Sequence, residues 1–168
     1  MVIAAPDLER ARAIAGAVRD PELPMLTLAD LGILRDVSLD EDGTVVVELT
    51  PTYSGCPALD MMRREVARRL DEAGFSGATV RTVLSPAWTS DWVTSRGRRA
   101  LADAGIAPPG AAPVGPTLLS LEPAPRVVAC PRCGASGTVK LSAFGATACR
   151  ALWRCTACHE PFERFKEL

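Results

Sequence analysis

The sequence predicts an α+β fold, in which a small helix–strand–strand–helix–strand sandwich is followed by a C-terminal zinc ribbon. Helical and β-type hydrophobic patterns alternate over residues 7–84, six of the 14 prolines fall within residues 106–125, and two C-x-x-C motifs occupy the last 42 of 168 residues. These observations predict three parts: an α+β domain over 1–106, a Pro-rich linker over 107–126 and a four-cysteine zinc ribbon over 127–168.

The first predicted element is a helix over residues 7–19. Its apolar residues fall on one helical stripe, with Arg and Glu on the opposite side: Leu8, Ala11, Ile14, Ala15 and Val18. Pro21 disfavours helical geometry in the residue before it, so this helix should end by Asp20. The passage that follows, to Ile33, is broken by prolines and Gly32, and we expect a turn and an extended segment there.

Two strands are predicted over residues 33–39 and 44–50, joined by a turn in which Gly43 takes a positive φ. A helix should then run over residues 57–73, where apolar residues recur at helical spacing. A third strand is predicted over residues 78–84. This order places the helices on one face of a small sheet.

Two tryptophans, Trp88 and Trp92, follow the third strand and lie four residues apart. We expect them to close the edge of the core, and a partner-binding surface is the alternative. A short polar helix is predicted over residues 95–104 before the Pro-rich linker begins.

Charge and hydropathy exclude several classes of protein. The net charge is −1 overall, with 13 Lys and Arg against 17 Asp and Glu in residues 1–126, and six against three in residues 127–168. Neither part has the strong positive charge of a nucleic-acid-binding protein. No apolar run is long enough for a membrane span or a signal peptide, so we expect a cytoplasmic location in which cysteines stay reduced.

Four cysteines near the C-terminus, Cys130, Cys133, Cys155 and Cys158, form two C-x-x-C motifs separated by 21 residues. This spacing is typical of a tetrahedral four-thiolate zinc site. A domain of about 40 residues has too small a core to fold alone, and a metal ion supplies the missing stability. Zinc is the predicted metal, and iron or a cluster in the same cage is the alternative.

Two further residues of this region need separate interpretation. Cys155, Cys158 and His159 also spell C-x-x-C-H, the attachment motif of c-type haem, but the upstream cysteine pair gives these two thiols a better assignment. His159 is then a surface residue or lies next to the metal ligands. Cys149 is predicted as a buried thiol, with an accessory role near the metal as the alternative.

Cys56 lies far from the other cysteines in the sequence, between Gly55 and Pro57. A cysteine at the start of a helix lies near unpaired backbone N–H groups, and the helix dipole favours the thiolate there. The structural alternative is a small buried hydrophobic side chain. Because the only histidine lies in the ribbon, a thiol-dependent enzyme with a histidine base is the least favoured interpretation.

The motifs DPE (20–22), DLGI (30–33) and TYSGCP (52–57) together resemble the MIP18-type domain. Its proteins are associated with iron–sulfur cluster assembly. The resemblance covers residues 7–84, and the hallmark residues fall on Asp20, Pro21, Glu22, Thr52 and Cys56. It implies a transient iron or cluster site in which Cys56 supplies a thiolate, Thr52 a hydroxyl, and Asp20 or Glu22 a carboxylate. A cluster bridged by Cys56 from two protomers, which requires a homodimer, is another arrangement.

With SPAWTSDWVT at 85–94 and the ribbon CPRCG…CRALWRCTACHEPFERFK, nearly the whole chain resembles the D subunits of bacterial phenylacetyl-CoA epoxidase. That resemblance implies an accessory or maturation protein of aerobic phenylacetate catabolism, without a catalytic site of its own. Its partners would be the oxygenase and reductase subunits of the monooxygenase. A structural subunit that stays in the oxygenase complex is the alternative.

Overall fold

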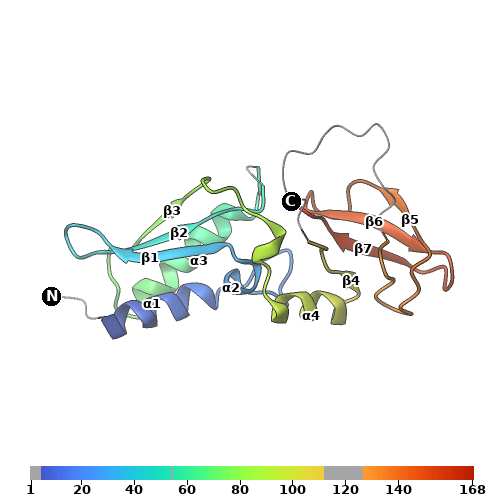
Figure 1. The fold of residues 1–168 in the computed structure, drawn as a ribbon. Coiled ribbons are helices and arrows are strands. Elements are labelled where there is room, and N and C mark those ends of the chain that lie inside the picture. The colour runs from blue at the N-terminus through green and yellow to red at the C-terminus, as the bar shows by residue number, and fades with distance from the viewer. Residues whose placement is uncertain (1–4, 54, 112–126) are drawn as a thin grey trace. The chain divides into compact units, whose positions relative to one another are not determined.

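The computed structural model describes residues 5–53, 55–111 and 127–168. The chain divides into two compact units. The N-terminal unit contains the described residues up to Trp88 together with Trp92–Gly97, and the C-terminal unit contains Thr89–Asp91 and the described residues from Arg98 to Leu168. Both helices and strands are present, which confirms the predicted α+β class (Figure 1). Within the described ranges no helix is long and apolar enough to cross a membrane.

The sheet of the N-terminal unit has three strands in the order β1-β2-β3: β1 (Leu34–Leu39), β2 (Val45–Leu49) and β3 (Thr79–Thr82). β1 pairs antiparallel with β2, as a short hairpin requires, and β3 pairs parallel with β2. A parallel neighbour needs a crossover connection, and helix α3 (Leu59–Glu72) supplies it. All three strands lie within the predicted ranges.

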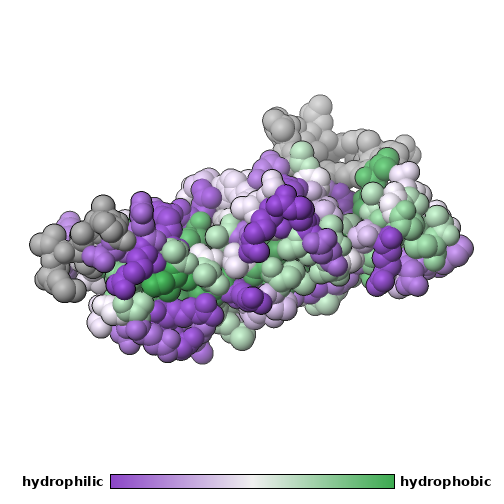
Figure 2. Space-filling model, turned by 90° about the horizontal axis from the view of Figure 1, so that it is seen from below, coloured by the Kyte–Doolittle hydropathy of each residue, from purple (hydrophilic) through white to green (hydrophobic). Residues whose placement is uncertain are grey.

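Helices α1 (Ala5–Gly16) and α3 contact one another and the sheet (Figure 1). Their inward faces are at most 1% exposed: Ala11 and Ala15 on α1, and Met62, Val66 and Leu70 on α3. Three of the exposed residues of α1, Glu9, Arg10 and Arg12, are charged, and hydrophilic side chains cover much of this unit on the face drawn in Figure 2. The amphipathic patterns therefore position both helices, although α1 ends at Gly16, three residues before the predicted end, and Val18 is buried outside the helix.

The expected extended segment before Ile33 is partly wrong, because Leu28–Leu31 form a helical turn, α2. Thr27 caps this turn: its hydroxyl accepts a hydrogen bond from the Asp30 backbone N–H at 3.2 Å, and the Asp30 carboxylate accepts one from the Thr27 backbone N–H at 2.9 Å. This is a capping box, and the T-x-x-D spacing in the sequence was a signal for it.

Asp30 also joins α2 to residues 94–96. It is 4% exposed, and its carboxylate accepts hydrogen bonds from the Thr94 hydroxyl at 3.3 Å and from Arg96 Nε at 2.7 Å. The pKa of Asp30 lies below its usual 3.8: burial would raise it, but the hydrogen bonds from Thr27 and Arg96 outweigh burial and favour the carboxylate. The DLGI motif therefore has a structural role in this fold.

Gly32 ends α2 with φ +66°, and an added Cβ there would lie 2.5 Å from Trp92 Cβ. We expect Gly32→Ala to destabilise the N-terminal unit by roughly 2 kcal/mol or more, because left-handed strain and overlap with Trp92 act together. Gly43→Ala is the matched control: its φ is +78° and nothing lies within 4 Å, so only the strain of about 1 kcal/mol should appear. Urea unfolding followed by circular dichroism measures both. Equal losses in the two variants would contradict the role of Trp92.

Trp88 closes the core as predicted. It is 6% exposed, and its indole Nε1–H donates to the Leu31 carbonyl at 2.9 Å. Trp92 ends a short 3-10 helix, η1 (Ser90–Trp92), and the Arg35 guanidinium stacks on its ring at 3.5 Å. Helix α4 (Ser95–Asp103) follows at the predicted position.

The C-terminal unit contains a sheet of four strands in the order β4-β7-β6-β5: β4 (Ile106–Ala107), β5 (Thr138–Ser142), β6 (Arg150–Cys155) and β7 (Pro161–Phe165). Strands β5, β6 and β7 form an antiparallel meander at the positions expected for the zinc ribbon. The first strand, β4, was not predicted and pairs parallel with β7.

Residues 98–110 are part of the C-terminal unit, although the domain boundary was predicted at 106/107. Ala107 pairs with Arg164, and the Gly110 backbone N–H donates to Glu167 Oε1 at 2.8 Å. Proline excludes helix from this segment, but it does not prevent the residues between prolines from pairing with a strand. The rest of the predicted linker, residues 112–126, lies outside the described residues.

Candidate functional site

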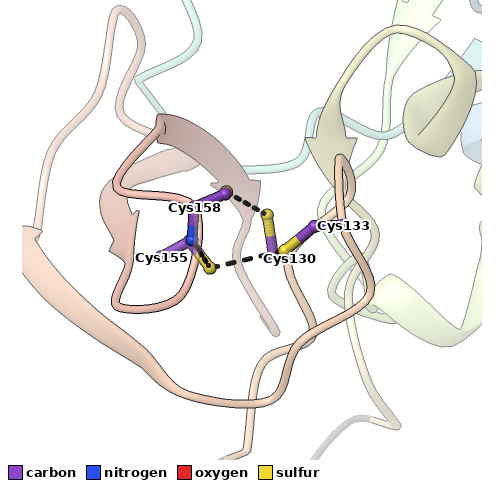
Figure 3. Close-up of side chains that lie close together, drawn as sticks. All are labelled: Cys130, Cys133, Cys155 and Cys158. Carbon is purple, nitrogen blue, oxygen red and sulfur yellow. Dashed lines mark hydrogen bonds between the residues drawn. The ribbon is translucent and has the colours of Figure 1, made fainter.

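The four predicted zinc ligands converge at one end of the ribbon (Figure 3). The sulfur atoms of Cys130, Cys133, Cys155 and Cys158 all lie within 4.8 Å of one another. Cys130 Sγ is 3.8 Å from Cys158 Sγ, and Cys133 Sγ is 3.6 Å from Cys155 Sγ. A tetrahedral zinc ion with Zn–S bonds of about 2.3 Å holds its sulfur ligands roughly 3.8 Å apart. The spacing of these thiols therefore fits a four-coordinate metal ion.

Each cysteine pair is held by a tight backbone turn. In the first, the Gly134 N–H donates to the Cys130 carbonyl at 2.9 Å, and Gly134 has φ +75°. In the second, His159 occupies the corresponding position after the last cysteine, with φ +61°. Sequence reasoning did not assign this role to either residue, although both follow the second cysteine of a C-x-x-C motif. The side chain of His159 is exposed, and the role of this residue is to take the left-handed backbone conformation that closes the turn.

Backbone donors stabilise negative charge on Cys155. Its sulfur accepts hydrogen bonds from the backbone N–H groups of Cys158 at 3.5 Å and Ala157 at 3.4 Å. These donors, that of Cys158 foremost, lower the pKa of the Cys155 thiol, although burial opposes the shift. They therefore favour the thiolate, the form that binds a metal cation.

The cysteines also form much of the ribbon's core. The buried cluster consists of Ala107, Val128, Cys130, Cys155 and Phe162, so two of its five members are thiols of the four-cysteine group. A metal ion bound by these thiols would therefore sit beside this cluster and link its segments.

Cys149 is buried but lies outside the four-cysteine group. Its sulfur is 3.0 Å from the Thr147 hydroxyl, and its carbonyl accepts a hydrogen bond from the Lys166 backbone N–H. Cys149 therefore packs in the interior of the C-terminal unit. An accessory role near the metal stays a prediction.

Cys56 lies in the loop that leads into α3. Its backbone N–H donates to the Tyr53 carbonyl at 3.2 Å, and its carbonyl accepts from the Leu59 N–H at 3.3 Å. The helix begins at Leu59, two residues later than predicted, so Cys56 precedes the helix by three residues. Cys56 and Thr52 are both half-buried, which leaves the Cys56 side chain partly accessible to solvent.

The two predicted carboxylate ligands have different environments. Asp20 is 7% exposed, and its Oδ1 accepts hydrogen bonds from the backbone N–H groups of Glu22 at 2.8 Å and Leu23 at 3.0 Å. Asp20 therefore stabilises the turn that contains Pro21. Glu22 is half-buried. Within the described residues, the only group of three or more Cys, His, Asp or Glu ligand atoms is the ribbon's. The structure thus does not bring Cys56, Asp20 and Glu22 together as such a group.

Comparison with known families matches each part of the chain to a different family. Residues 9–84 match the family described as "Iron-sulfur cluster assembly protein", and residues 115–166 match the "PaaD zinc beta ribbon domain". The first match contains Asp20, Glu22, Thr52 and Cys56, and the second contains all four ribbon cysteines.

Individual proteins match either nearly the whole chain or about half of it. A protein of Escherichia coli, provisionally named as the D subunit of 1,2-phenylacetyl-CoA epoxidase, is 41% identical over 98% of this chain and 95% of its own length. The "Fe-S protein maturation auxiliary factor YitW" of Bacillus subtilis is 35% identical over 50% of this chain and 82% of its own length. A solved structure from Bacillus anthracis, a "Domain of Unknown Function DUF59", superposes with a TM-score of 0.51 at 28% identity, over 56% of this chain and 90% of that one.

Proposed function

The chain belongs to the family of phenylacetyl-CoA epoxidase D subunits, and from this premise we propose that it assists the loading of iron or an iron–sulfur cluster into a partner subunit of the phenylacetyl-CoA monooxygenase. In this proposal the chain is an accessory protein of aerobic phenylacetate catabolism in the cytoplasm. Oxygen activation and reduction take place on the oxygenase and reductase subunits.

The observation that carries this proposal is the position of Cys56 within the part of the chain that matches the iron–sulfur assembly family. Cys56 is half-buried and precedes α3 by three residues. The helix is preceded by Ala58, which makes no side-chain capping hydrogen bond. Backbone N–H groups at the start of α3 favour a thiolate nearby, although the Asp60 carboxylate in the first turn offsets part of their positive charge.

A single accessible thiolate suits a carrier better than a storage site. Four thiolates hold iron or zinc tightly, as in the ribbon, whereas Cys56 with Thr52 and one carboxylate of Asp20 or Glu22 leaves coordination positions open. A partner's own ligands can occupy these positions and displace the weaker set. Because Asp20 already binds two backbone N–H groups, Glu22 is the more available carboxylate in this proposal.

We assign zinc to the ribbon, held by Cys130, Cys133, Cys155 and Cys158. The spacing of these sulfurs supports a tetrahedral ion of this size. When bound, the ion supplies a crosslink between the two backbone turns of the ribbon. The metal of the ribbon is structural in this account and separate from the iron at Cys56.

The test is the metal content of the partner subunits in cells whose only copy of the protein carries Cys56→Ser. We expect iron and acid-labile sulfide in the purified reductase and oxygenase subunits to fall severalfold relative to wild type, as they should when the gene is deleted. Cys149→Ser is the matched control, since it also replaces a cysteine outside the zinc group, and it should leave both quantities unchanged.

Normal iron and sulfide in the partners of the Cys56→Ser cells would contradict the carrier role. If the variant also stays bound to the oxygenase in stoichiometric amounts, the protein is a structural component of that complex instead. Co-purification of the complex from the same cells distinguishes these outcomes.

A further inference from the structure

A groove in the N-terminal unit is not used by the metal sites described above. It has a volume of about 390 Å³ and lies between the segment at Arg19 and Pro21 and one face of helix α3. Met61 and Met62 line it with Pro21, and these three residues give it an apolar floor. We call this feature the α3 groove.

The α3 groove is open to solvent. The side chain of Met61 is 61% exposed, and Arg64 and Arg68 on the next turns of the helix are exposed as well. A small-molecule site typically encloses most of its ligand, which walls of this kind do not. A groove with an exposed apolar residue and a charged rim fits one anchoring side chain of a protein partner. Methionine is suited to such a surface because it adapts to the shape of its partner.

The rim of the α3 groove carries positive charge that the unit does not neutralise. Arg68 is paired with Glu65 and Glu72, and Glu65 also accepts a hydrogen bond from Arg69. Among the described residues, the Arg19 guanidinium donates only to the uncharged Pro24 carbonyl, at 3.2 Å, and the Arg64 guanidinium makes no hydrogen bond or ion pair. Two guanidinium groups therefore flank the apolar floor although residues 1–126 are net acidic. This arrangement is complementary to a segment with carboxylates beside an apolar residue.

Both walls of the groove adjoin segments that carry the predicted iron ligands. Pro21 lies between Asp20 and Glu22, and Met61 follows Cys56 by five residues. We propose that the α3 groove binds an acidic segment of the partner subunit, with an apolar side chain against Met61 and carboxylates paired with Arg19 and Arg64. The inference rests on the proposed function, because it takes the subunit that receives iron as the bound partner.

The test uses the full-length chain and the purified oxygenase and reductase subunits, each immobilised in turn. We expect Met61→Asp and Arg64→Glu to weaken binding to one of these subunits by about tenfold or more, since each places a negative charge against an acidic partner. Leu84→Asp and Arg81→Glu are matched controls: Leu84 is 60% exposed, Arg81 is exposed on β3, and neither lines the groove. Wild-type binding should weaken as salt rises, because exposed charges are screened.

Equal binding by the groove variants and the controls would overturn the proposal, and so would the absence of binding by wild type to either subunit. Self-association that is lost in Met61→Asp, with partner binding unchanged, would show instead that a second copy of the chain occupies the groove.

The Cys56→Ser chain separates this inference from the proposed function. Weaker binding by the groove variants, with normal partner iron in Cys56→Ser cells, supports docking and contradicts the carrier role. Unchanged binding by the groove variants, with iron lost from the partner subunits of Cys56→Ser cells, contradicts docking and supports the carrier role.

Discussion

Cys155→Ser is expected to abolish zinc binding and to unfold the ribbon over residues 127–168. The thiol is fully buried, belongs to the four-cysteine group and is one of the five members of the ribbon's core. Binding of a structural zinc ion contributes about 10–16 kcal/mol to the folding of small domains. Metal analysis should give one zinc per wild-type chain and close to none per variant chain. Hydrogen exchange should show lost protection in β5, β6 and β7.

Cys149→Ser is the control for this experiment, because it changes a buried cysteine of the same unit that lies outside the group. It should keep one equivalent of zinc and the exchange protection of the three strands. A Cys155→Ser chain that loses its zinc but keeps a protected ribbon would show that the metal does not hold this unit together, and a chain that retains stoichiometric zinc would show that Cys155 is not a required ligand.

Asp30→Ala is expected to destabilise the N-terminal unit by roughly 3 kcal/mol, because it leaves several polar groups without their acceptor. These are the Thr27 backbone N–H and hydroxyl, the Thr94 hydroxyl and the Arg96 guanidinium. Asp36→Ala is the control: its carboxylate is 51% exposed and pairs with Arg12, and its loss should cost less than about 1 kcal/mol. Urea unfolding compares the two. Similar losses in both variants would contradict the central position of Asp30.

The same carboxylate makes stability depend on pH. The folded pKa of Asp30 lies below 3.8, so its contribution is fully present above that pH and is lost as the pH falls through the folded pKa. Asp30→Asn removes the charge with little change in shape. The difference in free energy of unfolding between wild type and Asp30→Asn should therefore shrink below pH 4. A difference that is constant from pH 7 to pH 3 would show that the charge of Asp30 does not contribute.

The ribbon was the part most fully predicted from sequence, because its determinants are local. Two short cysteine spacings specify the turns, and glycines at 134, 137 and 145 separate the short segments that form strands. Strand β4 could not be predicted in this way. It has two residues, carries no pattern of its own and exists only because β7 offers it an edge.

The N-terminal unit shows the same distinction. The amphipathic patterns of α1 and α3 specify their buried faces, whereas α2 forms because Thr27 and Asp30 cap it and residues 94–96 complete the hydrogen bonds of Asp30. The α3 groove escaped prediction because Arg19 and Met61 are far apart in sequence, and only the packed fold places them beside one cavity. The exposed apolar Met61, out of register with the buried stripe of its helix, was the one signal present in the sequence.

The most direct test of a carrier function for Cys56 is cluster transfer between purified proteins. The full-length chain, reconstituted anaerobically with iron and sulfide, would be mixed with the cluster-free reductase in the presence of an iron chelator, and visible circular dichroism would follow the cluster on the acceptor. We predict transfer from wild type and from Cys149→Ser, and none from Cys56→Ser, whose ribbon should still hold its zinc. Transfer from Cys56→Ser at the wild-type rate, or the failure of wild type to bind a cluster at all, would contradict the account.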